Sequence, residues 1–183
     1  MKRFFAVMIV LFLCIYAHGE TADNSLPVDL INCFGMTIDE LYSVIKAEYD
    51  EDSNGDSMTV CFFMEDNDTV TAIYALADDS QYGWNENEVF YFGVNSPSYC
   101  IAGYRDGEPF ETVESRLYAE EWAEVDTGSL PKWSQARFAD AVFEKDIESL
   151  HCRLGFFLED SDGVSTVRYL MCEATPLNIE EEQ

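Results

Sequence analysis

The chain has 183 residues, of which 36 are Asp or Glu and 10 are Lys or Arg, so its formal net charge at pH 7 is −26. Such a charge argues against binding to nucleic acid or to anionic lipid, because both are held by basic side chains that meet phosphate. The acids are spread along the whole chain, with only a short run at Glu180–Glu182. This distribution favours solubility over steering toward a basic partner as the reason for the charge.

Residues 1–19 are predicted to be a signal peptide. Lys2 and Arg3 precede an apolar run from Phe4 to Tyr16, and Ala17-His18-Gly19 then places small residues at positions −3 and −1 of a cleavage site. The run is too short for a comfortable membrane span. We therefore expect a secreted or extracytoplasmic protein with no membrane span after cleavage. Its processed form would hold 8 basic and 36 acidic residues and carry a formal charge of −28.

The next elements are an apolar run, a helix and three strands. Thr37 to Glu40 fits a capping box at the start of a helix, and apolar residues follow at helical spacing: Ile38, Leu41, Val44, Ile45 and Tyr49. The acidic stretch from Asp50 to Asp56 is predicted to end this helix. Strands are then expected at 58–64, at 70–77 as the return of a hairpin, and at 88–94.

The second half is predicted to repeat this order. A short strand at 99–102 leads to a helix that begins near Pro109, where the missing amide costs nothing. Phe110, Val113 and Leu117 form the apolar stripe of that helix. A hairpin from 152–158 to 164–171 follows, with Asp162-Gly163 as its turn.

The register of this hairpin decides whether Cys152 and Cys172 can pair. A two-residue turn pairs residues whose numbers sum to 325, which gathers the apolar side chains on one face and puts the two cysteines on opposite faces. A disulfide between them is then excluded, because the Cβ atoms point apart. No pair of cysteines has C-x-x-C spacing, so a zinc site of that kind is not expected.

Residues 134–148 lie in an insertion. Apolar side chains recur there with a period close to 3.6: Phe138, Ala139, Val142, Phe143, Ile147 and Leu150. The period predicts a helical insertion near 132–150, although Val142-Phe143 could also begin an extra strand.

The chain contains an internal repeat. Residues 62–73 reappear as 156–167 at a shift of 94, and residues 35–41 resemble 107–113 at a shift of 72. We therefore expect a first repeat at 20–97 and a second at 98–183. The fold class that follows is α+β: two tandem helix-plus-antiparallel-hairpin repeats share one antiparallel sheet, with helices on one face. The short connection from Asn95 to Ser98 keeps the halves together in a monomer.

This pattern resembles the helix-plus-sheet module of the β-lactamase-inhibitor-protein-like superfamily, which includes SmpA-type outer-membrane assembly lipoproteins and many exported bacterial proteins. The residues that carry the resemblance are Gly35, Thr37, Glu40, Leu41, Val70 and Ile73 in the first copy, and Gly107, Glu111, Val113, Val164 and Val167 in the second. The resemblance implies a tandem module that binds another protein through sheet and loops and catalyses nothing. The chain lacks a disulfide within each half, so only the fold is carried over.

Catalytic and metal sites are not expected. The processed chain would hold one histidine, His151, and no evident nucleophile motif. A carboxylate-dependent extracytoplasmic hydrolase is the alternative function, because acid pairs are abundant. Asp50, Asp52 and Asn54 match the opening of a calcium loop and make weak calcium binding a further alternative, but Cys61 stands where the loop requires a bidentate glutamate.

The expected function is binding to an unknown extracytoplasmic protein, without a cofactor. Trp84, Trp122 and Trp133 are the candidate contact residues, because large rigid aromatics dominate binding energy at interfaces. Trp84 stands in a polar loop beside Gly83 and Asn85 and is expected to be exposed.

Overall fold

The structure is a computed structural model that describes residues 27–54, 56–76 and 83–177. The predicted signal peptide at residues 1–19 lies outside the described residues.

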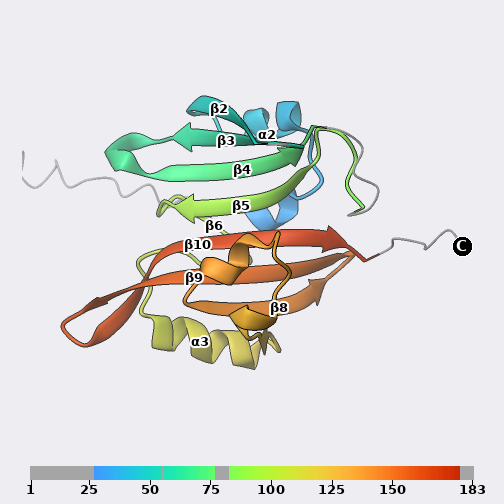
Figure 1. Ribbon diagram of the computed structural model, residues 1–183. Coiled ribbons are helices and arrows are strands. Elements are labelled where there is room, and N and C mark those ends of the chain that lie inside the picture. Colours follow the sequence, from blue (N-terminus) through green and yellow to red (C-terminus); the bar gives the residue numbers. More distant parts are fainter. Residues whose placement is uncertain (1–26, 55, 77–82, 178–183) are drawn as a thin grey trace, which may run out of the picture.

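Eight strands form one antiparallel sheet, in the order β2-β3-β4-β5-β10-β9-β8-β7. In chain order they are β2 (Glu48–Asn54), β3 (Ser57–Phe63), β4 (Thr69–Ala75), β5 (Val89–Asn95), β7 (Ala123–Glu124), β8 (Ala141–Ile147), β9 (Leu150–Ser161) and β10 (Val164–Pro176). The short strands β1 (Val28–Asp29) and β6 (Tyr99–Cys100) pair in parallel as a separate ribbon. Figure 1 shows that β5 and β10, which are far apart in sequence, lie side by side in the middle of the sheet.

The two α-helices are α2 (Ile38–Val44) and α3 (Phe110–Ala119). Short 3-10 turns occur at η1 (Leu30–Cys33), η2 (Glu65–Asn67), η3 (Thr127–Ser129) and η4 (Gln135–Phe138). The predicted capping box is confirmed, since the Glu40 amide donates to Thr37 Oγ1 at 3.4 Å and the Thr37 amide donates to Glu40 Oε2 at 2.9 Å. The start of α3 after Pro109 is confirmed as well.

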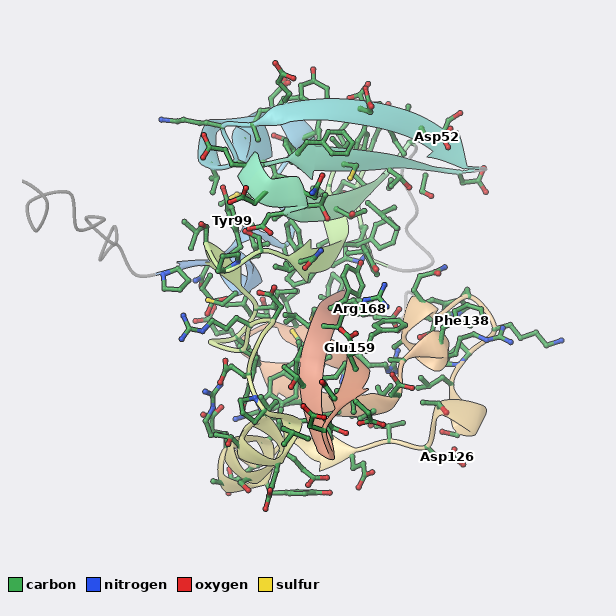
Figure 2. The ribbon with its side chains drawn as sticks, turned by 90° about the vertical axis from the view of Figure 1, so that its left-hand side faces the viewer. Asp52, Tyr99, Asp126, Phe138, Glu159 and Arg168 are labelled. Carbon is green, nitrogen blue, oxygen red and sulfur yellow. The ribbon has the colours of Figure 1, made fainter. Side chains whose placement is uncertain are left out.

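The main core lies between the sheet and the two helices. Leu41 of α2 and Leu117 of α3 are fully buried against inward side chains of the strands, including Phe62, Phe92 and Phe156. On the opposite side of the sheet, the segment 125–140 covers only part of β8, β9 and β10. Figure 2 shows this segment, marked by Asp126 and Phe138, on the side away from the helices. The helix side of the sheet is therefore covered more completely than the opposite side.

The predicted α+β class with two helix-plus-hairpin repeats is wrong. The chain is mostly β, with one eight-stranded antiparallel sheet and α-helices of only 7 and 10 residues in its described part. Each helix precedes four strands rather than one hairpin. The error comes from two segments that were assigned to helix, or to a helix end, and that form strands.

The first of these segments is β2. The predicted helix included Tyr49, but α2 ends at Val44 and residues 48–54 pair with β3, with Tyr49 opposite Phe62. The Tyr49 ring stacks on Tyr42 of α2 at 4.6 Å between centroids. Acidic residues are poor strand formers, yet they suit an edge strand because they discourage pairing with other chains.

The second segment is β8, which replaces the helix predicted near 132–150 and confirms the alternative that Val142-Phe143 begins an extra strand. Val142 is buried under the segment 125–140, whereas Phe143 is buried in the main core. A strand that is buried on both faces loses its alternating pattern. Adjacent apolar residues can then imitate a helical period.

The β9–β10 hairpin turns at Asp162-Gly163, as predicted, but its register changes along its length. Val167 lies opposite Leu158, which gives the predicted sum of 325, and a bulge at Arg168 then shifts the pairing so that Tyr169 lies opposite Phe157. Beyond the bulge, Cys152 pairs with Ala174 and Cys172 with Leu154. The prediction that the cysteines lie on opposite faces is therefore wrong. Both are fully buried in the main core, as free thiols.

The repeated sequence adopts different local structures in its two copies. Phe62 and Phe156 are both fully buried in the main core. After them, residues 65–67 form the 3-10 turn η2, whereas the matching residues 159–161 continue strand β9. The similarity of structure therefore does not extend to the turns, although the similarity of sequence does.

Gly93 is a packing requirement of the sheet. A Cβ atom at Gly93 would lie 1.6 Å from the hydroxyl oxygen of Tyr169, because the tyrosine ring crosses the sheet over this position. The Tyr169 hydroxyl is hydrogen-bonded to the Tyr91 hydroxyl at 3.0 Å, and the ring packs edge-on against Phe157. The glycine makes room for this ring.

We predict that Gly93→Ala destabilises the protein by about 1–3 kcal/mol, the usual cost of overpacking. In a Tyr169→Ala background the same change should cost much less, since the clashing ring is gone. Urea unfolding of the four chains of this double-mutant cycle measures the coupling. Equal costs in both backgrounds would contradict the conclusion that Gly93 makes room for the Tyr169 ring.

We also predict selective labelling of the cysteines in the native protein. Burial raises the pKa of Cys33 and of Cys172, and raises that of Cys100 to about 11, so these thiols are protonated at neutral pH. Cys61 is only half-buried. Native alkylation at pH 7.5 followed by peptide mapping should label Cys61 at least about tenfold faster than the other four described cysteines. A cross-linked Cys152–Cys172 peptide would refute the free-thiol state.

Candidate functional site

A cavity of about 290 Å³ lies on the less covered side of the sheet, where β3 begins and β10 ends. Its walls include three aromatic side chains, Trp84, Phe90 and Trp133. Two carboxylates, Asp56 and Glu173, also line it. The remaining lining residues are small, aliphatic or uncharged: Ser57, Thr59, Ile73, Ala75, Gln135, Ala174 and Thr175. We refer to this feature as the aromatic cavity.

Trp84 forms a fixed wall of the aromatic cavity. Its indole N–H donates to the Ala174 carbonyl at 3.1 Å, and only 5% of the residue is exposed. A Cβ atom at Gly35 would lie 3.4 Å from the indole ring, so the tryptophan is packed between the loop before α2 and the end of β10. The predicted exposure of Trp84 is wrong, because the polar residues beside it point elsewhere while its ring closes the end of the core.

Trp133 forms the opposite, solvent-facing wall. It precedes η4 in the segment 125–140, and 50% of it is exposed. The structure thus brings two of the three predicted aromatic contact residues to one cavity. Trp122 lies elsewhere, in the main core, where it packs edge-on against Tyr104 and is 4% exposed.

Glu173 holds the segment that carries Trp133 against the sheet. Its carboxylate accepts hydrogen bonds from the Ser134 hydroxyl and, at 3.1 Å, from the Gln135 amide. Arg153 of the neighbouring strand β9 donates to the same carboxylate at 2.6 Å. Glu173 and Ser134 are both buried. This is a charge-assisted network in a desolvated place, where each bond is stronger than at the surface.

The network continues along β8 and β9 toward the surface. Arg153 lies 3.6 Å from Glu144, whose carboxylate lies 3.5 Å from His151 Nε2. His151 Nδ1 is 2.8 Å from Asp146. The histidine is thus partnered by two carboxylates of β8 and lies outside the lining of the aromatic cavity.

Sequence reasoning missed Glu173 and Arg153. The only signal was that each interrupts an apolar strand: Glu173 follows Leu170-Met171-Cys172, and Arg153 lies between Cys152 and Leu154. A charged residue inside such a strand is rarely buried without a partner. The two interruptions could have been matched as a pair, although the bulge at Arg168 hides the register that aligns them.

Beside the aromatic cavity, the uncovered part of the sheet forms a surface that we call the open face. It is made by outward side chains of β3, β4, β5, β9 and β10, including Phe63, Thr69, Gly93, Phe157 and Tyr169. Phe63 is 45% exposed. Burial raises the pKa of Tyr91 well above its usual range, and the adjacent Tyr169 hydroxyl raises it further, so the tyrosine pair stays neutral and rigid under this surface.

The calcium candidate does not form a loop. Asp50 and Asp52 lie within strand β2, opposite Cys61 and Thr59, and Asn54 is the last residue of that strand. An extended strand cannot wrap its side chains around one ion as an EF-hand loop does. Within residues 27–54, 56–76 and 83–177, no group of three or more His, Cys, Asp or Glu residues is placed to hold a metal ion. These residues therefore form a strand and not the calcium loop that the sequence suggested.

Comparison of the chain with protein-family models, with curated proteins and with solved structures gave no match. The similarity to the inhibitor-like module therefore stays a prediction. Among the described residues, no helix has the length and apolar character needed to cross a membrane.

We predict that Arg153→Met destabilises the protein by about 3–5 kcal/mol, because it leaves the buried Glu173 carboxylate without its cation. The double change Arg153→Met/Glu173→Met should cost less than the single one, since it removes both charges. Chemical unfolding monitored by circular dichroism measures each cost. His151→Gln, at the exposed end of the network, is the control and should cost under about 1 kcal/mol. Equal costs for Arg153→Met and the double variant would contradict the role of the pair.

Proposed function

We propose that the chain is an exported, non-enzymatic protein-binding module, and that the open face with the aromatic cavity is its binding surface. The observation that carries the proposal is the uneven covering of the sheet. Helices cover most of one side, whereas on the other side the segment 125–140 covers only part of the strands and leaves aromatic side chains in contact with solvent on a strongly acidic molecule.

The exposed aromatics support this choice of surface. Phe63, Trp133 and Phe138 are 45%, 50% and 64% exposed. Phe138 lies on the side of the sheet away from the helices (Figure 2), Trp133 belongs to the same segment 125–140, and Phe63 alternates with the inward Phe62. Trp133 lines the aromatic cavity, and Phe63 lies at the opposite end of β3. Exposed apolar groups that are rimmed by polar residues are typical of protein-interaction sites. Aromatic residues dominate the energy of such sites.

The geometry of the sheet supports a rigid binding surface. The Tyr91–Tyr169 hydrogen bond and the close contact of Tyr169 with Gly93 fix the middle of the open face. A rigid face loses little conformational entropy when a partner binds. The net charge of −26 favours a basic partner, because complementary charge speeds encounter and rejects acidic proteins.

The proposal predicts that changes on the open face abolish capture of a partner. The immobilised chain is incubated with envelope and medium fractions of the producing cell, and bound protein is identified by mass spectrometry. A partner held by this face should be lost, by about tenfold or more in affinity, with the double variant Phe63→Ala/Thr69→Arg, which removes an aromatic anchor and adds bulk with like charge toward a basic partner.

Tyr118→Ala is the matched control, because Tyr118 is an equally exposed aromatic of α3, on the helix side. This variant should retain the partner. If both variants bind the same proteins equally, the open face is not the binding surface. If the protein turns over a glycan or peptide library without a stoichiometric partner, the non-enzymatic function is wrong.

A further inference from the structure

The aromatic cavity has the composition of a site for a cation. Trp84, Phe90 and Trp133 supply aromatic surface from three different segments of the chain. Aromatic faces attract ammonium and guanidinium groups through the ring quadrupole, and tryptophan does so most strongly. The indole N–H of Trp84 is used by the Ala174 carbonyl, so its ring rather than its donor is available to line the space.

The charges in the cavity walls also favour binding of a cation. Among the described residues that line the space, the two ionisable ones are acids, Asp56 and Glu173, and none is a lysine or arginine. Glu173 already has a cation, Arg153, at 2.6 Å. Asp56 is exposed, and no described residue donates a hydrogen bond or forms an ion pair with its carboxylate. Within the part of the chain that the structure describes, the Asp56 charge beside the aromatic walls therefore has no cationic partner.

The size of the cavity limits its occupant. About 290 Å³ is at the lower end of the range for small-molecule sites, so it suits a single long side chain rather than a large ligand. A purely apolar side chain would displace water from Asp56 without offering it a hydrogen bond, which is unfavourable. An arginine satisfies both features, because its guanidinium stacks on aromatic rings and also forms paired hydrogen bonds with a carboxylate.

We propose that the aromatic cavity binds an arginine side chain of the partner, with the guanidinium against the indole of Trp133 and paired with Asp56. This inference rests on the proposed protein-binding function and names the chemistry that its partner must present. Glu173 acts as a positioning residue, since it holds the segment 131–135 that carries Trp133.

The test uses N-acetyl-arginine amide as the probe and N-acetyl-citrulline amide, which has nearly the same shape without charge, as its control. The indole N–H signals of ¹⁵N-labelled protein are followed during titration at low salt. The arginine probe should shift the signals of Trp84 and Trp133 saturably, and citrulline at equal concentration should shift them at least about fivefold less, as expected when a cation–π contact and an ion pair are both lost.

Asp56→Asn and Trp133→Leu should each weaken binding of the arginine probe about two- to fivefold. In the Trp133→Leu variant the Trp84 signal serves as the readout. Asp39→Asn, which removes an exposed acid from α2 on the helix side, is the matched control and should leave binding unchanged. Dispersed amide spectra of each variant verify that it is folded.

Equal shifts with arginine and citrulline, the absence of any shift, or equal weakening by Asp56→Asn and Asp39→Asn would each overturn the inference. The outcome is independent of the test of the open face, because Phe63 and Thr69 do not line the aromatic cavity. Failure of the probe with partner capture intact rejects the arginine site alone. A bound probe with no partner on the open face rejects the proposed function instead.

Discussion

The pairing of β5 with β10 is the contact on which the rest of the molecule depends. Val94 lies opposite Leu170 and Tyr91 opposite Glu173, so these two strands join the halves of the chain into one sheet. On one side of the joint, Phe92, Val94 and Leu170 belong to the main core under the helices. On the other side, Gly93 and Tyr169 belong to the open face, and Glu173 lines the aromatic cavity. One strand pair thus sets both the core and the candidate site.

The bulge at Arg168 makes this joint possible. Without it, the sum of 325 would continue along the hairpin and would place Tyr169 opposite Phe156, in the main core. The extra residue turns Tyr169 outward over Gly93 and turns Leu170 and Cys172 inward. It also places Glu173 opposite Arg153. Bulges are common where a sheet must redirect a side chain toward a functional surface, and this one redirects Tyr169 and Glu173.

The sequence predicted local structure well and long-range structure poorly, for physical reasons. The Thr37–Glu40 capping box and the Asp162-Gly163 turn depend on neighbouring residues, and both were confirmed. Strand β2 depends on pairing with β3, so its own residues do not indicate it, and β8, which is buried on both faces, was indicated only as the alternative strand at Val142-Phe143. The bulge follows from packing across the sheet, so the prediction for Cys152 and Cys172 failed with it.

The candidate site follows the same rule. Trp84 and Trp133 could be chosen from the sequence because of their residue type. Their position at one cavity, however, depends on strand β10, where Ala174 accepts the hydrogen bond of Trp84 from 90 residues further along the chain. The roles of the acidic residues also depend on where the fold places them. Most of them lie on the surface, whereas Glu173 is buried with its own cation, and Asp56 lines the aromatic cavity with no cation beside it among the described residues. An acidic residue therefore points to a function here only through its surroundings in the fold: burial beside a cation for Glu173, and an aromatic surface for Asp56. These surroundings can be recognised only when the register of the strands is known.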